Sequence, residues 1–193
     1  MTLRIIGGLF RNRPLKSPKT NHTRPTLAIM RKAVLDILQS KIEGASFLDL
    51  YAGTGAMGLE ALSRGAVHST FVEANRHALD CIKNNIKTLD VESQCTLMGY
   101  EDFLALKKMV KEGRHFDVVY VDPPYAAASH LNLLHKILHF FDANSLLNKE
   151  GFLFLEEAAP PTLQPETMSL NHLKHMNTRI FSRSALHQFR LLS

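Results

Sequence analysis

The sequence has only two cysteines and no tryptophan among its 193 residues, and it contains no long apolar run. Cys81 and Cys95 stand outside any CxxC pair, so the disulfide framework of a small secreted domain is excluded. The longest apolar runs, such as the one that ends at Val121, are far shorter than the ~20 residues of a membrane helix, and the basic N-terminus has no apolar signal segment. We therefore expect a cytoplasmic protein with no membrane partner.

The composition also lacks the bias of a disordered or fibrous chain. Apolar residues make up 45% of the sequence and charged residues 21%, which is the ordinary mixture of a globular protein. A chain of this length fits one domain of about 150 to 200 residues and buries ~70% of its unfolded surface. We predict one domain over residues 1–193, in which a basic N-terminal hairpin extension (1–25) precedes the core (26–193).

Positive charge is concentrated at the N-terminus. Of the net charge of +5, residues 1–41 carry +8, because nine Lys and Arg residues face a single acid, Asp36, whereas the rest of the chain carries −3. Such a segment can bind a polyanion, since each phosphate contact releases counterions. The alternative is that these charges only form a solvent-exposed basic surface and bind no polyanion. Apolar residues such as Ile5 and Phe10 interleave with the charges, which favours a folded, nucleic-acid-binding surface.

Apolar periodicity predicts the N-terminal elements. Residues 3–6 and 9–15 are typical of two short strands around Gly7 and Gly8, and Asn12 tolerates left-handed geometry. Thr26 is expected to cap a helix that has Arg31 and Lys32 on its polar side. The apolar positions of this helix recur at helical spacing and are Leu27, Met30, Val34, Leu35 and Leu38.

From residue 45 onward, predicted strands alternate with predicted helices. The strands cover 46–50, 68–73, 94–98, 116–121 and 151–156, and the helices cover 57–64, 75–88, 102–111 and 129–141. This alternation is typical of an α/β protein with a doubly wound parallel sheet. Residues 174–181 and 186–192 add a closing antiparallel pair, so we predict a mainly parallel seven-stranded sheet with an antiparallel C-terminal strand.

A glycine-rich turn directly follows the first strand of this sheet. Gly53, Gly55 and Gly58 match the GxGxxG pattern of dinucleotide-binding turns, and Glu73 ends the next strand, where a carboxylate can bind ribose hydroxyls. Any tight strand-to-helix turn also selects glycine, so the pattern alone leaves NAD and a purely structural role open. Asp49 favours S-adenosylmethionine, because its carboxylate would repel a pyrophosphate and would be compensated by a sulfonium or amino group.

The most informative segment is Asp-Pro-Pro-Tyr at 122–125, immediately after a predicted strand. The exocyclic amine of a base is a weak nucleophile, because its lone pair is delocalised into the ring. Asp122 can accept one N–H of such an amine and the Pro123 carbonyl another, while Pro124 restrains the loop and Tyr125 can stack on the base. The segment therefore predicts methyl transfer to an amine that is held in a fixed orientation, rather than a strand that two prolines merely end.

Taken together, these segments resemble one family of enzymes. The opening RIIGG and RNRPL segments, Arg24-Pro-Thr26, the glycine turn, Phe71-Val-Glu73 and residues 122–125 are similar to the RsmD family of class I methyltransferases, which act on guanine N2 in small-subunit (16S) rRNA. The resemblance implies a Rossmann-like fold, S-adenosylmethionine as the cofactor, and 16S rRNA as the partner, within the small ribosomal subunit or an assembly intermediate. The implied site residues are Asp122, Pro123, Pro124 and Tyr125 for catalysis, Asp49, Tyr51, Gly53, Gly55, Glu73 and Asp102 for the cofactor, and Arg4, Arg11, Arg13 and Arg24 for RNA.

The chain departs from the family pattern at three places. Asn12 stands where the family usually has glycine, and the residues around 27–28 and 31–32 differ from its usual polar pairs. Gly99-Tyr100 replaces an aspartate that commonly meets the adenine edge. Glu101, Asp102 or the backbone are then the candidates for that contact.

Three other functions compete with this interpretation. DNA adenine-N6 methyltransferases share the Asp-Pro-Pro-Tyr segment but usually carry a sizeable recognition insertion, and glutamine-N5 methyltransferases typically have Asn at its first position. A non-catalytic RNA-binding module is the third alternative. His135 and His139 are spaced i, i+4 on a predicted helix, but no Cys or carboxylate completes a tetrahedral set, so we predict no metal.

Overall fold

The computed structural model describes residues 3–17, 26–124 and 130–192. Two of the predicted site residues, Arg24 and Tyr125, lie outside these ranges. Within them, no helix is long and apolar enough to cross a membrane.

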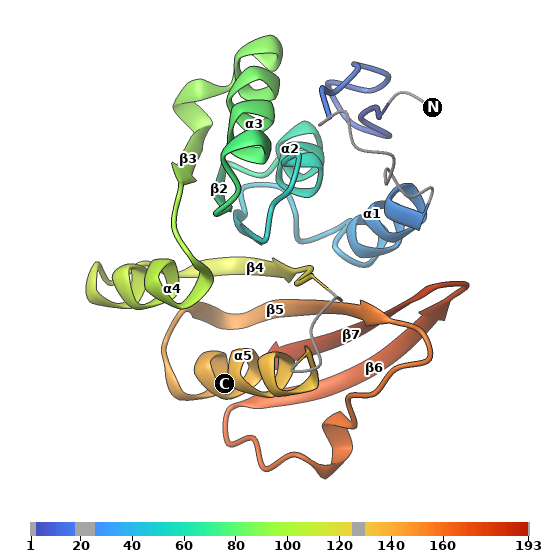
Figure 1. The fold of residues 1–193 in the computed structure, drawn as a ribbon, viewed down its shortest axis with the longest axis vertical. Helices are drawn as coiled ribbons and strands as arrows, with labels where there is room; N and C mark the ends of the chain where they lie inside the picture. The colour runs from blue at the N-terminus through green and yellow to red at the C-terminus, as the bar shows by residue number, and fades with distance from the viewer. Residues whose placement is uncertain (1–2, 18–25, 125–129, 193) are drawn as a thin grey trace.

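Seven strands form one sheet in the order β3-β2-β1-β4-β5-β7-β6 (Figure 1). Strands β1 to β5 pair in parallel, and β7 is antiparallel to both of its neighbours, β5 and β6. The strands are β1 (Ser46–Leu50), β2 (His68–Val72), β3 (Cys95–Met98), β4 (Phe116–Val121), β5 (Leu147–Ala158), β6 (Leu173–Phe181) and β7 (Ser184–Leu191). The predicted fold class is therefore confirmed. The chain proceeds outward from β1 in one direction and from β4 in the other, so the carboxyl ends of these two strands mark the switch point where α/β proteins bind ligands.

In the part of the chain that the structure describes, five α-helices cover the two faces of the sheet. They are α1 (Thr26–Ile37), α2 (Ala56–Ser63), α3 (Arg76–Leu89), α4 (Asp102–Lys111) and α5 (His130–Ala143). Side chains alternate along each strand, so Phe47 of β1 packs in the same core as α1, α2 and α3, whereas Leu48 packs with α4 and α5. Val118 and Val119 of β4 alternate in the same way. Two apolar layers, one on each face, therefore hold the sheet between the helices.

Most predicted boundaries agree with the structure to within one or two residues. Asn75 caps α3 as predicted, with its side chain accepting hydrogen bonds from the N–H groups of His77 and Ala78. Strand β5 is longer than predicted at both ends. Its register with β4 shifts between Phe116 and Val118, so the added N-terminal residues continue the pairing with β4 across an irregularity.

The N-terminal hairpin differs from the prediction of two regular strands. The chain does turn back on itself, because the Ile5 N–H donates to Arg13 O at 3.0 Å and the Leu15 N–H to Leu3 O at 2.8 Å. The ladder, however, is limited to one isolated bridge between Arg4 and Pro14. The N–H groups of residues 6, 7, 9 and 10 donate to α2 and not to the opposite side of the hairpin, which prevents regular pairing. We call residues 3–17 the N-terminal arm.

The prediction that Arg31 lies on the polar side of its helix is wrong. Arg31 is only 3% exposed, and its Nη2 donates to the Arg4 carbonyl at 2.9 Å. Its Nε lies 3.9 Å from a carboxylate oxygen of Glu60 on α2. Burial lowers the pKa of Arg31, and the Glu60 carboxylate opposes this effect. Arg31 precedes Val34 and Leu35 by three and four positions, so helical spacing places it on the same face as these core residues. There, Glu60 and the Arg4 carbonyl are its polar partners.

Candidate active site

A cavity of about 350 Å³ lies at the carboxyl edge of the sheet, beside the switch point. The residues that line it end or follow β1, β2, β3 and β4, and the first and last of them, Tyr51 and Pro124, are more than 70 positions apart in the sequence. Its polar and aromatic lining includes Tyr51, Glu73, Asn75, Tyr100, Glu101, Asp102 and Asp122. The carboxyl ends of parallel strands meet at one edge, which explains how these distant residues come together.

The glycine turn connects β1 to α2 at this edge. Gly53 and Gly55 have φ angles of +56° and +74°, which a residue with a side chain adopts only at a cost. Gly55 is the N-terminal cap residue of α2. The third glycine of the motif serves packing, because a Cβ at Gly58 would lie 2.4 Å from the ring of Phe71. The turn thus places the backbone of Gly53 and Gly55 at the N-terminal end of α2.

Glu73 is oriented by backbone groups on both of its carboxylate oxygens. Its Oε2 accepts a hydrogen bond from Gly53 N at 2.8 Å, and its Oε1 accepts one from Asn75 N at 2.8 Å. Each carboxylate oxygen has a second lone pair. Glu73 can therefore accept hydrogen bonds from two ribose hydroxyls while the turn holds it in place.

Tyr51 and Asp102 are directly paired within the cavity. The Tyr51 hydroxyl donates to Asp102 Oδ2, and Asp102 Oδ1 accepts from the N–H of Phe103 in the first turn of α4 at 2.7 Å. Burial, together with this acceptor, raises the pKa of Tyr51 far above its usual value, so the phenol stays protonated and keeps donating. The sequence predicted both residues but not their contact, since 51 positions separate them.

Tyr100 was not among the predicted site residues, although it lines the cavity and is 42% exposed. The sequence signal that could have identified Tyr100 as a site residue is its position shortly after β3, because residues at the carboxyl ends of parallel strands border the ligand site. Glu101, one of the candidates for the adenine contact, lines the same wall.

Asp49 lies beneath the turn and does not line the cavity. It is only 2% exposed, and its Oδ2 accepts a hydrogen bond from Gly58 N at 2.9 Å. Burial raises the pKa of this carboxyl to about 7, against the stabilising effect of the Gly58 N–H. Its predicted contact with the cofactor stays a prediction.

Asp122 follows β4 and lines the same cavity as Glu73 and Asp102. Its N–H donates to Leu50 O at 3.3 Å, which ties the start of the Asp-Pro-Pro segment to the end of β1. Pro123 is buried and Pro124 lines the cavity. The predicted catalytic turn and the predicted ribose-binding acid therefore face one space.

Three of the predicted RNA-binding residues lie on the exposed surface of the arm: Arg4, Arg11 and Arg13. Arg4 donates to Asn12 O at 2.7 Å, and Arg13 donates to Thr88 O, at the end of α3, at 2.7 Å. A guanidinium has five N–H donors, so each retains donors for a phosphate. Among the described residues, no group of three His, Cys, Asp or Glu side chains is arranged to hold a metal ion.

The strand order, with β7 inserted antiparallel between β5 and β6, and the acid-lined cavity beside a glycine turn define a class I methyltransferase. The chain belongs to the family described as conserved hypothetical protein 95, the RsmD family, whose model matches residues 3–190. The resemblance inferred from the sequence is thereby confirmed.

Individual relatives agree with this assignment. Ribosomal RNA small subunit methyltransferase D of Haemophilus influenzae is 33% identical over 181 residues, which cover 93% of this chain and 91% of the relative. Among solved structures, yhhF of Escherichia coli, described as a candidate methyltransferase, is 25% identical with a TM-score of 0.79 and covers 100% of this chain and 99% of its own. The 16S rRNA N2 G1207 methyltransferase RsmC of T. thermophilus, solved with AdoMet and guanosine, is 17% identical with a TM-score of 0.72. The match covers 100% of this chain and 50% of RsmC, and at this identity the likeness concerns the fold alone.

Proposed function

We propose that this protein transfers a methyl group from S-adenosylmethionine to N2 of a guanine in small-subunit rRNA. The observation that carries the proposal is that Asp122, the acid of the Asp-Pro-Pro segment, lines one cavity with Glu73 and the Tyr51–Asp102 pair. An amine held by Asp122 and a nucleoside held by Glu73 would then share one space, as a direct displacement requires. The family and its rRNA methyltransferase relatives support the same substrate class.

The residues of the cavity suit S-adenosylmethionine. Glu73 would accept the ribose hydroxyls, and the wall formed by Tyr100 and Asp102 would border the adenine. The turn at Gly53 and Gly55, which is bonded to Glu73, would border the aminoacyl part. When bound, the cofactor supplies an electrophilic methyl group on a sulfonium. The negative charge of the carboxylates that line this cavity favours such a cation.

Asp122 and the prolines would prepare the guanine amine for attack. The Asp122 carboxylate accepts one N–H of the amine and the Pro123 carbonyl accepts the other, which directs the nitrogen lone pair away from the ring. Because Pro123 and Pro124 restrict the backbone, these acceptors are oriented before the substrate arrives. Orientation of this kind can supply about 7 to 11 kcal/mol of a barrier. Tyr125 would stack on the base.

The N-terminal arm would bind the RNA backbone around the target. Arg4, Arg11, Arg13 and Arg24 would contact phosphates, which position an RNA without specifying its sequence. A guanine inside a helix would have to be flipped out, at a cost of a few kcal/mol. The proposal places this reaction in the cytoplasm, on 16S rRNA within the small subunit or an assembly intermediate. Residues 1–193 would form one domain, in which the arm binds the RNA and the core carries out the transfer.

Labelled-methyl transfer to unmodified 16S rRNA and to small subunits, followed by nucleoside analysis, tests the proposal. N2-methylguanosine is the expected product. N6-methyladenosine, methylated glutamine in a protein substrate, or RNA binding without any transfer would replace the proposal by one of the three alternatives.

The Asp122→Ala variant tests the role of the acidic turn. We expect transfer to fall by about 10²- to 10³-fold, because the amine loses the acceptor that orients it, while the affinity for S-adenosylmethionine stays nearly unchanged. Asp80→Ala, which removes an exposed carboxylate from α3, is the control and should retain full activity. Equal losses of transfer and cofactor affinity would instead assign Asp122 to the cofactor.

A further inference from the structure

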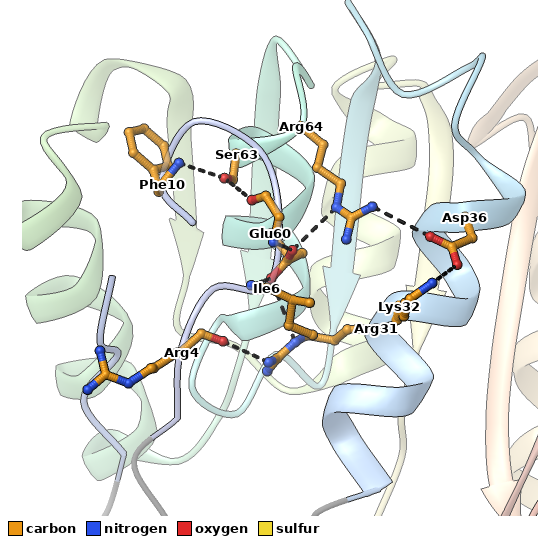
Figure 2. Close-up of polar contacts among 10 residues, drawn as sticks. Arg4, Ile6, Phe10, Arg31, Lys32, Asp36, Glu60, Ser63 and Arg64 are labelled. Carbon is orange, nitrogen blue, oxygen red and sulfur yellow. Dashed lines mark hydrogen bonds and ion pairs between the residues drawn. The ribbon is translucent and has the colours of Figure 1, made fainter. Parts of the chain in front are cut away.

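A buried carboxylate on α2 holds the start of the N-terminal arm (Figure 2). Glu60 is 0% exposed, and its Oε2 accepts a hydrogen bond from Ile6 N at 2.8 Å while its Oε1 accepts one from Gly7 N at 2.7 Å. Hydrogen bonds to a charged acceptor are about twice as strong as neutral ones and are directional. The two oxygens therefore fix the backbone of two consecutive arm residues relative to the helix.

Two guanidinium groups compensate the charge of this carboxylate. Arg31 of α1 lies with Nε 3.9 Å from Glu60 Oε2, and Arg64 lies with Nε 3.3 Å from Oε1. Arg31 also donates to Arg4 O at 2.9 Å, so α1, α2 and the arm meet at one point. A buried charge without such partners would be strongly destabilising. The arrangement is therefore a specific polar contact between three segments, which adds a defined orientation to the apolar packing of Ile5 and Leu15 in the core.

Ser63, one turn after Glu60 on the same face of α2, holds the next part of the arm. Its hydroxyl accepts from Phe10 N at 2.9 Å (Figure 2) and donates to Gly7 O at 2.6 Å. Its carbonyl accepts from Leu9 N at 2.7 Å. Residues 6, 7, 9 and 10 are thus all bonded to two residues of one helix. Pairing within the arm joins its two ends, whereas the segment between them is held by α2.

This attachment leaves the outer side of the arm exposed. Leu9 is 83% exposed, and the Arg11 and Arg13 side chains are also exposed. A segment that is ordered before binding avoids the entropic cost that a disordered segment incurs when it meets its partner. The same helix begins at the glycine turn, so a rigid element of eight residues connects the arm to the cofactor cavity.

We propose that Glu60 is a positioning residue for RNA binding, which, with Ser63, holds the N-terminal arm in its RNA-binding shape before the RNA arrives. The inference rests on the proposed function, because it takes rRNA as the partner of the arm. Glu60 itself is buried and contacts no RNA; it acts through the backbone of Ile6 and Gly7.

The Glu60→Gln variant tests the proposal. Glutamine has the same shape, but its amide presents one N–H₂ group to a backbone N–H and lacks the charge that pairs with Arg31. We expect the KM for an unmodified 16S rRNA transcript to rise by about tenfold, which corresponds to about 1.4 kcal/mol, while kcat at saturating RNA and the affinity for S-adenosylmethionine stay within about twofold of wild type. Hydrogen exchange of the Ile6 and Gly7 amides should become faster.

Asp36→Asn is the matched control. Asp36 belongs to the same charge network, since it pairs with Arg64 at 3.7 Å and with Lys32, but it does not touch the arm (Figure 2). It should leave the KM for rRNA and the exchange of both amides unchanged. An equal rise in KM for the two variants would overturn the proposal, because the network and not the bonding of the arm would then matter.

Replacement of Glu60 also leaves Arg31 buried without its carboxylate, so Ser63→Ala provides a second variant if Glu60→Gln does not fold. It removes the hydroxyl that bonds Phe10 and Gly7 and should raise the KM for rRNA with kcat retained. An unchanged KM in the folded variant, or parallel losses of kcat and cofactor affinity, would overturn the proposal. If wild type itself neither binds nor methylates the transcript, the proposed function fails. Slower hydrogen exchange of the arm amides in wild type than in the variants would still show that Glu60 and Ser63 hold the arm.

Discussion

The two ends of helix α2 use glycine in opposite ways. At its N-terminal end, Gly53 has φ +56°, and a Cβ there would meet nothing within 4 Å, so the turn borders open space. At its C-terminal end, Gly8 of the arm has φ +74°, and a Cβ there would lie 1.8 Å from the carbonyl oxygen of Ser63. One glycine lies beside open space, and the other allows two backbones to approach closely.

Each end of the helix also has a buried carboxylate, and the partners of the two differ. Asp49 accepts one N–H, from Gly58, whereas Glu60 accepts two and faces two guanidinium groups. With so little compensation, burial raises the pKa of Asp49 to about 7. The comparison teaches that the same residue types build an open site or a fixed contact, depending on how completely their partners satisfy them.

The largest loss of stability is expected for Gly8→Ala. Left-handed strain and the clash with the Ser63 carbonyl together should lower the free energy of unfolding by about 3 kcal/mol, and the displaced arm should bind rRNA more weakly while cofactor affinity is retained. Urea unfolding and filter binding measure both quantities. Gly44→Ala is the control, because Gly44 has φ +73° but nothing within 4 Å of its Cβ position. Equal destabilisation of the two variants would mean that the close approach contributes nothing.

Asp49→Asn should stabilise the protein in a pH-dependent way. The folded state raises this pKa to about 7, so it binds the proton more tightly than the unfolded chain does. Stability of wild type should therefore decrease as the pH rises from about 4 to about 7, and the full penalty should be present above that range. We expect the variant to gain on the order of 4 kcal/mol at pH 8, because the pKa is raised from 3.8 to about 7, and little at pH 4.

Denaturant unfolding at several pH values measures this difference. A constant gain across the range would show that burial does not raise the pKa of the Asp49 carboxyl.

Gly53→Ala should affect the cofactor and spare the arm. The strain at φ +56° is about 1 kcal/mol, with no clash, and it should shift the N–H that orients Glu73. We expect S-adenosylmethionine to bind about fivefold more weakly, measured by calorimetry, with rRNA affinity unchanged. Gly113→Ala, at φ +64° and with equally open space beyond α4, provides the comparison and should not alter cofactor affinity. A matching decrease there would assign the effect to general destabilisation.

The smallest effect concerns the exposed arginines of the arm. Replacing Arg11 and Arg13 by Ala should flatten the salt dependence of RNA binding, with the slope of log K against log salt falling by about one for each phosphate that the arm no longer binds. Binding measured between low and moderate salt gives the slope. Lys83→Ala removes an exposed charge from α3 and should leave it unchanged. An unaltered slope in the double variant would show that the arm is not the RNA-binding surface.

Much of the fold could be predicted because its signals are local. The alternation of apolar residues located β1, α4 and β4 at their observed boundaries, and Asn75 predicted the start of α3. The neighbourhood of Glu73 and Asp122 followed from a general rule, since parallel strands end at one edge.

The prediction places Arg31 on the wrong side of α1, although this residue precedes Val34 and Leu35 by three and four positions, a spacing that places it on the apolar face. Its partners, Glu60 and the Arg4 carbonyl, could not be predicted because they come from distant segments.

The sequence by itself determined the order of strands and helices, the glycine turn and the position of the acidic segment after β4, because each depends on residues close together in the chain. Only the tertiary structure decided that Asp49 lies beneath the turn, that Tyr51 binds Asp102, and that Glu60 holds an arm 53 and 54 positions away. The contacts of Tyr51 and Glu60 join residues more than 50 positions apart, so they depend on how whole elements pack. Neither periodicity nor turn chemistry encodes that packing.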